Sequence, residues 1–185
     1  MPARRWCPSD DRHVAYVVYN VGEAKRRYDL EFTRSDNRGK TWSPPAVLSA
    51  RRVATNDMAD HFYPMIAAAG DGLVFAVWFD DRDGPLSVWA RRSTDGGRTW
   101  SADVRLSRPQ GLVGIYGEYG GIGIDGDGVL HVAWSEGTGH VSQPGAKGGT
   151  WYARWDARAV APSGQESPAT VAQRRPRSTK RSSRQ

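Results

Sequence analysis

The chain has 185 residues, of which 38% are hydrophobic, and a formal net charge of +6. Its single cysteine, Cys7, excludes an internal disulfide and a zinc site built from several cysteines. No run of residues is long and apolar enough to span a membrane, and residues 1–8 contain two arginines without the apolar segment of a signal peptide. We therefore expect neither a membrane span nor a signal peptide in this chain, and leave its localisation open.

The first predicted unit occupies residues 5–49. Its clearest element is the apolar segment 13–19, and similar segments begin at Leu73 and Val129, 60 and 56 residues further along. Only the four residues 5–8 stand where the innermost strand of this unit belongs. A period of this length, built from short strands and turns, predicts an array of supersecondary units that must pack on one another to fold.

The second unit, 60–107, has the clearest strand pattern. Turns rich in Gly, Asp and Pro separate four short segments, which are 62–69, 73–79, 86–92 and 102–106. This pattern predicts an antiparallel meander. Four-stranded sheets of this kind, repeated around an axis, are the blades of a β-propeller.

The third unit, 115–158, repeats the order of strands, with Tyr152-Ala153-Arg154 aligned to Trp89-Ala90-Arg91. We therefore predict an all-β fold, a partial β-propeller of about three four-stranded antiparallel blades within residues 1–160. Three blades do not close a ring. Either two copies associate to complete one, or the chain is a fragment of a longer propeller, which is the interpretation we favour.

The last segment, 161–185, is rich in Pro, Ser, Gln and Arg and has few large apolar residues. Six basic residues against Glu166 give it +5 of the total charge of +6. Such a composition buries too little apolar surface to order itself, so we expect a disordered, solvated tail. The remainder of the chain is nearly neutral, and we do not expect a nucleic-acid partner.

An eight-residue phrase follows the third strand of the first two units: SDNRGKTW at 35–42 and STDGGRTW at 93–100. An Asp in third place accepts backbone N–H groups, a Gly in fifth place tolerates a positive φ, and the closing Trp offers a large apolar face to the core. Asn37 keeps an acceptor oxygen at the Asp position of the first copy but lacks the charge. We interpret the phrase as a structural turn between the third and fourth strands.

Repeated once per four-stranded unit, this phrase resembles the Asp-box, or bacterial neuraminidase repeat, of the sialidase-like propeller superfamily. The resemblance spans roughly residues 12–158, and the second copy matches every defining position. It implies a six-bladed propeller in the intact enzymes, which hydrolyse terminal sialic acids from glycoconjugates without a metal and are often secreted. Two departures stand out: the chain has no Arg-Ile-Pro-like phrase to supply the first clamp arginine, and the third unit lacks the eight-residue turn.

Strand alternation assigns the connections to two faces of such a propeller. The eight-residue turns lie on one face. The opposite face, where we expect any functional site, receives the connections from second to third strands and from blade to blade, which are 20–29, 50–61, 80–85, 107–119 and 136–149.

The resemblance implies roles for residues on this face. A Tyr nucleophile activated by Glu replaces the usual pair of carboxylates in sialidases, and planar guanidinium groups suit the carboxylate of sialic acid. By this analogy Tyr119 or Tyr116 is the nucleophile, with Glu118 as its base. The acid/base would be Asp57 or Asp60. The residues that bind the substrate would be Arg51, Arg52, Arg82 and Asp81.

Each assignment has a structural alternative, which we favour. Residues 80–84 read as a turn in which the acids cap backbone N–H groups and Arg82 pairs locally. Glu118 and Tyr119, adjacent on a strand, would point to opposite sides of the sheet unless the chain bends there. His61 reads as a solvated loop residue, and His140 has no partner at the spacing of a metal site, so we expect no metal or other cofactor.

Three functions remain open from the sequence. The chain is a sialidase-like glycoside hydrolase or part of one, a noncatalytic Asp-box propeller that binds a glycan or a protein, or an inactive remnant. A glycan or glycoconjugate is the expected partner in the first case, and no membrane partner is expected in any.

Overall fold

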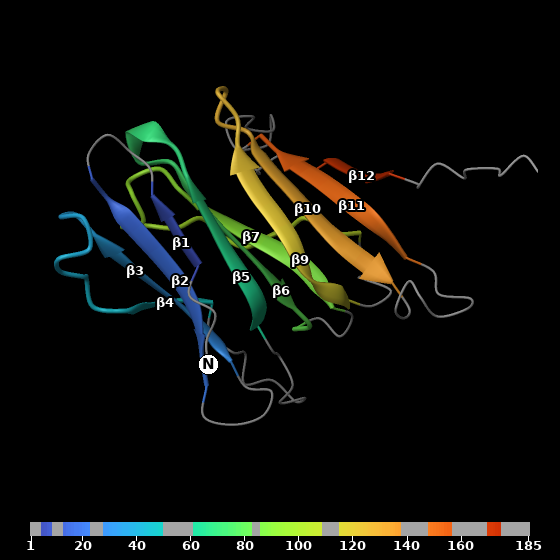
Figure 1. Cartoon of the computed structure of the whole chain (residues 1–185), viewed down its shortest axis with the longest axis horizontal. Helices are drawn as coiled ribbons and strands as arrows, with labels where there is room; N and C mark the ends of the chain where they lie inside the picture. The colour runs from blue at the N-terminus through green and yellow to red at the C-terminus, as the bar shows by residue number, and fades with distance from the viewer. Residues whose placement is uncertain are drawn as a thin grey trace, which may run out of the picture.

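The computed structural model describes residues 5–8, 13–22, 28–49, 61–82, 86–108, 115–137, 148–156 and 170–174. Within these residues every regular element is a β-strand apart from one short 3-10 turn, η1 (Gly70–Gly72). The strands form three antiparallel sheets of four, arranged one after another in chain order (Figure 1). The predicted all-β, partial propeller fold is confirmed.

Each sheet is a simple meander whose strands pair in the order of the chain. Sheet 1 contains β1 (Arg5–Pro8), β2 (Ala15–Val21), β3 (Asp29–Ser35) and β4 (Ala46–Ser49). Sheet 2 contains β5 (His61–Ala68), β6 (Val74–Asp80), β7 (Ser87–Ser93) and β8 (Val104–Arg105). Sheet 3 contains β9 (Ile115–Ile124), β10 (Leu130–Gly137), β11 (Gly148–Trp155) and β12 (Thr170–Arg174).

Two apolar cores lie between the sheets, because the strands of sheet 2 bury both of their faces. Val74, Ala76 and Trp78 of β6 point toward sheet 1, where they meet side chains such as Val18 and Phe32. The alternate residues of β6, which are Phe75, Val77 and Phe79, point toward sheet 3. All of β6 is buried, as expected for a strand covered on both faces.

Sheet 1 forms with its short innermost strand in place, since β1 pairs with β2 from Arg5 opposite Val18 to Pro8 opposite Ala15. Sheet 3 differs from our expectation at its outer edge. The segment 161–185 was expected to lack regular structure, yet Thr170–Arg174 forms β12 and pairs with β11 from Thr150 to Arg154. Without a fourth strand, the outer edge of β11 would present unpaired N–H and C=O groups. The backbone of a short Thr-Val-Ala stretch satisfies these groups without needing a large apolar side chain.

Strand registers correct two of the alignments drawn from the sequence. Ala15 lies opposite Ser35 and Val74 opposite Ser93, so the second strands of sheets 1 and 2 are related by 59 residues, not 60. Trp78 lies opposite Trp89 and Trp134 opposite Trp151, so Trp151, not Tyr152, is equivalent to Trp89. A shift of one residue matters because it moves a side chain to the other face of its sheet.

The two eight-residue turns close their hairpins as predicted, but only Trp100 packs against a core, whereas Trp42 is 41% exposed. In the second copy, the Asp95 carboxylate accepts hydrogen bonds from the N–H groups of Arg98 and Thr99, both at 2.9 Å, and from the Thr99 hydroxyl at 2.6 Å. In the first copy, the Asn37 Oδ1 accepts the Thr41 N–H at 2.8 Å. The serine that opens each turn accepts the N–H of the fifth-place glycine, Gly39 or Gly97.

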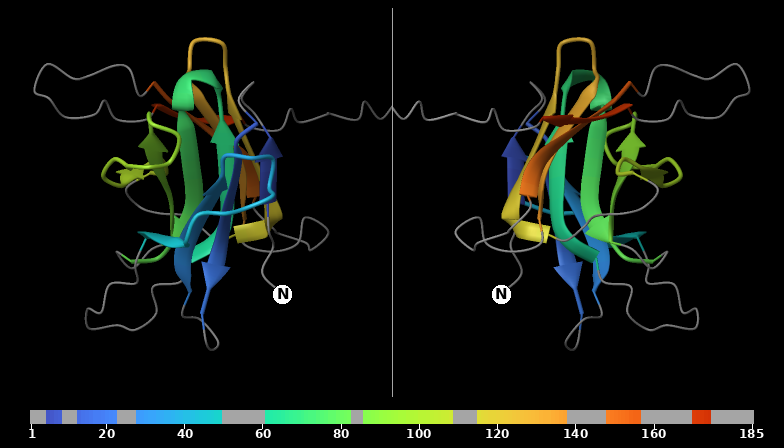
Figure 2. Two further views of the ribbon diagram at one scale, coloured as in Figure 1. Left: turned by 90° about the vertical axis from the view of Figure 1, so that its left-hand side faces the viewer. Right: turned by 90° about the vertical axis from the view of Figure 1, so that its right-hand side faces the viewer.

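The connections emerge on two faces, as strand alternation predicts. We call the one with the eight-residue turns, η1 and the β9–β10 turn the turn face, and the opposite one, at the C-terminal ends of β2, β6 and β10, the loop face. Figure 2 shows the three sheets from both sides, with η1 and the β9–β10 turn at the same end of the strands.

Asp95 offers a test of the turn. The hydroxyl and N–H of Thr99 hold the pKa of Asp95 well below its ordinary value. A carboxyl group whose pKa is lowered by folding stabilises the fold above its unfolded pKa, and this contribution is lost as the pH falls through the folded pKa. We expect Asp95→Asn to make the free energy of unfolding fall less steeply between about pH 5 and about pH 2.

Urea denaturation of the wild type and of the variant at several pH values measures this slope. Asp127→Asn, in the exposed β9–β10 turn, is the matched control and is expected to keep the wild-type slope. An Asp95→Asn variant with an unchanged slope would show that the turn does not depend on the charge.

Candidate functional site

The site residues expected from the sequence were all assigned to connections of the loop face, and the structure describes only some of them. Arg51, Arg52, Asp57, Asp60 and His140 lie outside the described residues, and of His61 only the backbone is described. The backbone of β9 carries Tyr116, Glu118 and Tyr119. Asp81 and Arg82 follow β6 directly.

A bulge interrupts β9 where the expected nucleophile and base lie. Ile115 pairs with Glu136 and Gly120 with Trp134, so the four residues 116–119 face the single residue Ser135. Extra residues in one strand bend it and re-aim its side chains, and such bulges are frequent next to active sites. The backbone at Glu118 and Tyr119 is therefore not that of a regular flat strand.

A second bulge lies at the equivalent place in sheet 2. Phe62 pairs with Phe79 and Met65 with Val77, so Tyr63 and Pro64 face the single residue Trp78. Tyr63 has a φ of 46°, which is rare for a residue with a Cβ atom. Backbone in this region is strained by about 1–3 kcal/mol and is found most often at functional sites. The innermost strands of two neighbouring sheets are thus irregular at the loop-face end.

Buried carboxylates end the second strands of sheets 2 and 3. Asp80 is fully buried and Glu136 is 3% exposed. Each accepts a hydrogen bond from the indole N–H of the tryptophan two residues before it, at 3.2 Å from Trp78 and 3.0 Å from Trp134. The Trp78–Asp80 and Trp134–Glu136 pairs are 56 residues apart in the sequence. The chain therefore repeats a Trp-x-acid motif at the loop-face end of sheets 2 and 3.

Arginines compensate the charge of both carboxylates. Arg82 donates its Nε to Asp80 at 2.6 Å and pairs with Asp103, and its third nitrogen donates to Ser49 of sheet 1 at 2.8 Å. Arg108, which follows β8 of sheet 2, donates to Glu136 of sheet 3 at 2.6 Å. The Arg108–Glu136 ion pair joins sheet 2 to sheet 3, and Arg82 reaches sheet 1 through its bond to Ser49. These contacts fix the relative position of neighbouring blades.

The Arg82 guanidinium folds back from the loop face into the interface between sheets 1 and 2. It lies 4.8 Å from the centroid of Trp89 and 5.8 Å from that of Trp78, and its side chain is 6% exposed. Burial alone would lower the pKa of Arg82, but the hydrogen bonds and charges of Asp80 and Asp103 more than offset this effect and raise it. The backbone N–H of Arg82 also donates to Asp80 at 2.7 Å, so the predicted local turn is present.

Arg82 and Asp81 therefore differ as candidates for substrate binding. All three guanidinium nitrogens of Arg82 donate to groups of the protein itself. Asp81 is half-buried at the start of the connection from β6 to β7. The residue that sequence reasoning missed is Glu136 as a buried, paired acid; the repeated Trp-x-acid pattern at 78–80 and 134–136 is the signal that identifies it.

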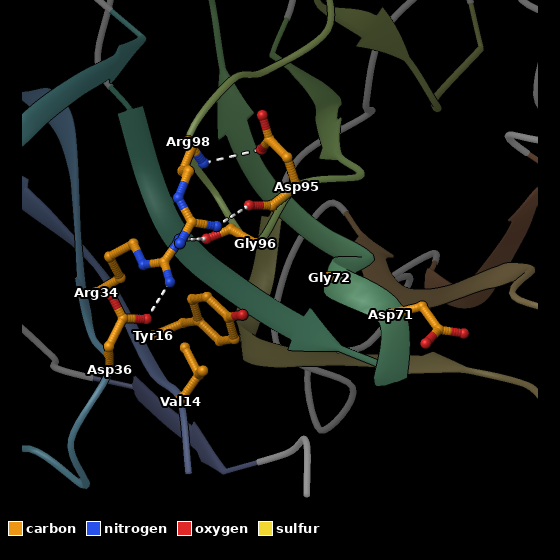
Figure 3. Close-up of a pocket in the computed structure, with 9 residues that line it drawn as sticks. All are labelled: Val14, Tyr16, Arg34, Asp36, Asp71, Gly72, Asp95, Gly96 and Arg98. Atoms are coloured by element: carbon orange, nitrogen blue, oxygen red, sulfur yellow. Dashed lines mark hydrogen bonds and ion pairs between the residues drawn. The ribbon is translucent and has the colours of Figure 1, made fainter. Parts of the chain in front are cut away.

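The turn face has a cavity of about 320 Å³ between sheets 1 and 2 (Figure 3). Two arginines dominate its wall: Arg34 donates to the Gly96 carbonyl at 2.6 Å and pairs with Asp36, and Arg98 donates to the Asp95 carbonyl at 2.7 Å. The bond from Arg34 joins the second eight-residue turn to sheet 1, whereas the bond from Arg98 stays within that turn. Both arginines of the cavity are thus engaged with groups of the protein, and we assign it no catalytic role.

The described part of the chain contains no cluster of three or more His, Cys, Asp or Glu side chains that could hold a metal ion. None of the helices in the described residues is long and apolar enough to cross a membrane.

Comparison with solved structures finds the same fold in two kinds of enzyme. One is an ulvan lyase of polysaccharide lyase family PL25, solved alone and bound to -[GlcA(1-4)Rha3S]-; it has a TM-score of 0.59 and 14% identity, over 92% of this chain and 42% of the lyase. The other is the GH93 alpha-L-arabinofuranosidase of Fusarium graminearum in complex with arabinobiose, with a TM-score of 0.53 and 13% identity, over 86% of this chain and 45% of that enzyme.

Both kinds of enzyme are propellers. At this level of identity the likeness shows the fold alone, and this chain spans less than half the length of either structure. No protein-family model matches the chain, and none of the curated proteins compared with it does so. The chain is therefore similar to part of a propeller enzyme in its fold.

Asp80 allows the role of the buried ion pairs to be measured. Asp80→Ala leaves the Arg82 guanidinium buried with Asp103 as its carboxylate partner among the described residues, and removes the acceptor of the Trp78 indole. Breaking a buried ion pair in this way costs about 3–5 kcal/mol. We expect the free energy of unfolding, measured by chemical denaturation, to fall by an amount in this range. The exposed control Asp127→Ala should change it by less than about 0.5 kcal/mol, and an equally small effect of Asp80→Ala would contradict the structural role.

Proposed function

We propose that this chain is part of a carbohydrate-active propeller enzyme whose catalytic groups lie on the loop face, and that its reaction is the sialidase-type hydrolysis of a sugar that carries a carboxylate. The bulge at 116–119 of β9 is the observation that carries the proposal. It places a Tyr, a Glu and a second Tyr in an irregular stretch of an innermost strand, at the end where the blade-to-blade connections emerge.

The fold supports the broad class. The two structures with which it is compared are a polysaccharide lyase and a glycoside hydrolase, which perform different reactions on glycans. A propeller scaffold therefore serves more than one glycan chemistry, and the choice between them depends on the residues of the loops. The uronic acid in the oligosaccharide bound to the lyase, like sialic acid, carries a carboxylate.

Tyr119 is assigned as the nucleophile, with Glu118 as the base that takes the phenol proton; Tyr116, in the same bulge, is the alternative nucleophile. The phenolate oxygen forms a bond to the anomeric carbon while the bond to the leaving oxygen breaks, and an acid protonates that oxygen. Water then releases the sugar, with the same acid acting as base. The tyrosyl pathway suits an anionic sugar because a neutral phenol approaches it without the repulsion that a carboxylate meets.

Asp57 or Asp60 is assigned as the acid/base. Both belong to the connection between β4 and β5, and β5 contacts β9 in the structure. Arg51 and Arg52, from the same connection, are assigned to the substrate carboxylate, because guanidinium groups bind carboxylates in a bidentate manner. Since Arg82 already donates to three protein groups, its part is to support the connections on the loop face, and Asp81 remains as a neighbouring substrate contact.

The decisive experiment is an assay of the purified full chain with fluorogenic sialosides, next to aryl arabinofuranosides and a uronic-acid polysaccharide. We expect turnover of a sialoside. Tyr119→Phe and Glu118→Gln should each lower kcat by about 10²-fold or more, because they remove the nucleophile and its base. The joint variant Arg51→Ala/Arg52→Ala should mainly raise KM for substrates with a carboxylate.

Asp127→Asn, which changes a carboxylate on the turn face, is the matched control and should keep full activity. Turnover of a sialoside that survives both Tyr119→Phe and Tyr116→Phe would contradict the assigned nucleophile. Turnover of the uronic-acid polysaccharide alone, or binding of a sialoside without any turnover, would contradict the proposed reaction.

A further inference from the structure

The outer face of sheet 1, which points away from sheet 2, is unusually apolar for a surface. Strand alternation puts Val17, Tyr19 and Val21 of β2 on this face, because Tyr16 and Val18 point into the core shared with sheet 2. Val47 of β4 lies opposite Glu31 on the same outer face. Val21, Val47 and Trp42 are 41%, 55% and 41% exposed, and they are the exposed large apolar side chains of the described residues.

The chain itself shows how a face of this kind is covered. Sheet 2 turns the equivalent face toward sheet 1, and its eight-residue turn packs on Phe32. The Trp100 ring meets the Phe32 ring edge-on, with centroids 5.1 Å apart. At Gly97 an added Cβ would lie 2.4 Å from Phe32, so the backbone of the turn touches that ring. Arg34 completes the contact by donating to the Gly96 carbonyl at 2.6 Å.

Sheet 3 reproduces the receiving half of this contact on its own outer face. His131 lies opposite Arg154 as Tyr16 lies opposite Arg34, and Ala133 lies opposite Tyr152 as Val18 lies opposite Phe32. The resulting aromatic pairs have nearly the same geometry. Tyr16 and Phe32 are stacked at 6.2 Å and 22°, and His131 and Tyr152 at 5.8 Å and 27°.

The receiving residues of sheet 3 are held in place. His131 bonds to the Tyr152 hydroxyl through Nδ1 at 2.5 Å and to Asp125 through Nε2 at 2.8 Å. Arg154 is exposed and has no hydrogen-bond or ion-pair partner among the described residues. The outer face of sheet 3 thus offers an oriented aromatic ring and an available guanidinium, where sheet 1 offers Phe32 and Arg34.

The inserting half of the contact is free on sheet 1. The turn at 35–42 places Gly39 and Trp42 where the second turn places Gly97 and Trp100. A Cβ added at Gly39 would meet only the Trp42 ring, at 3.6 Å, so nothing in the described residues occupies the position that Phe32 takes beside Gly97. Trp42 is 41% exposed for the same reason.

We propose that these two faces bind each other between two copies of the chain. Sheet 1 of each copy packs on the outer face of sheet 3 of the other, with Trp42 against Tyr152 and Arg154 donating to a carbonyl of the facing turn. The two contacts are identical and close a ring of six sheets. The complementarity of the two faces favours a second copy as the occupant: sheet 3 carries Tyr152 and Arg154 where sheet 1 carries Phe32 and Arg34, and the turn at 35–42 leaves Trp42 exposed. The inference does not depend on the proposed reaction.

The mass of the purified full chain in solution, measured by sedimentation or light scattering over a range of concentrations, tests the assembly. We expect a species of twice the 20.4 kDa of one chain. Trp42→Asp and Tyr152→Asp should each halve that mass, while Ala102→Asp, an exposed position in the turn of sheet 2, should leave it unchanged. Circular dichroism checks that the variants fold. Val47→Lys on the outer face of sheet 1 and Arg154→Glu on that of sheet 3, both at exposed positions, should lower the mass in the same way.

Mixing identifies which faces meet. A dimer of one Trp42→Asp chain and one Tyr152→Asp chain keeps one unaltered contact, so mixing the two variants should restore part of the double mass. A symmetric pairing of two sheet 1 faces predicts instead that Tyr152→Asp has no effect. That result, a wild type of single-chain mass at every concentration, or an open series of larger species would overturn the proposal.

Discussion

A four-stranded sheet of this chain can bury an apolar face only against another sheet, and the rest of the structure follows from this constraint. Sheet 2 meets it on both sides, which is why every residue of β6 is buried and why alternate side chains of that strand serve two different cores. The interfaces are not purely apolar. The Asp80–Arg82 and Glu136–Arg108 pairs lie among tryptophans at the loop-face end of each interface. Buried charges of this kind require a defined partner, so they fix the register of one blade against the next more strictly than apolar contacts do.

The two ends of the strands are stabilised in different ways. On the turn face, side chains such as Ser93 and Asp95 satisfy the backbone within a few residues, so each hairpin is closed locally. On the loop face, the contacts run between sheets, as in the bond from Arg82 to Ser49. A site on the loop face would therefore rest on groups contributed by several blades, which agrees with the assignment of its residues to separate connections.

Periodic features of the sequence predicted most of the fold, because the turns are local and the strands repeat. The eight-residue phrase specifies its own hydrogen bonds, and the apolar segments at Leu73 and Val129 mark the second strands within one residue. Strand β12 escaped prediction because its stability comes from the free edge of β11 and not from its own composition. The bulge in β9 was not predicted either, because it depends on how β9 pairs with β10 and cannot be read from the residues of β9 alone. For the site, the local pairing of Arg82 with Asp80 was predictable from their spacing. Its contact with Asp103 depends on how sheet 2 folds, and its bond to Ser49 depends on packing between sheets.

On the loop face, the connections from second to third strands differ in length, whereas the two eight-residue turns on the turn face are equally long. Six residues separate β6 from β7, and ten separate β10 from β11. Since the second strands of sheets 2 and 3 each end in a buried acid at the loop face, residues can be inserted beyond Asp80 or Glu136 without disturbing the cores. Such a scaffold allows new specificities to evolve by exchange of one loop at a time, with the cost to folding confined to the exchanged segment.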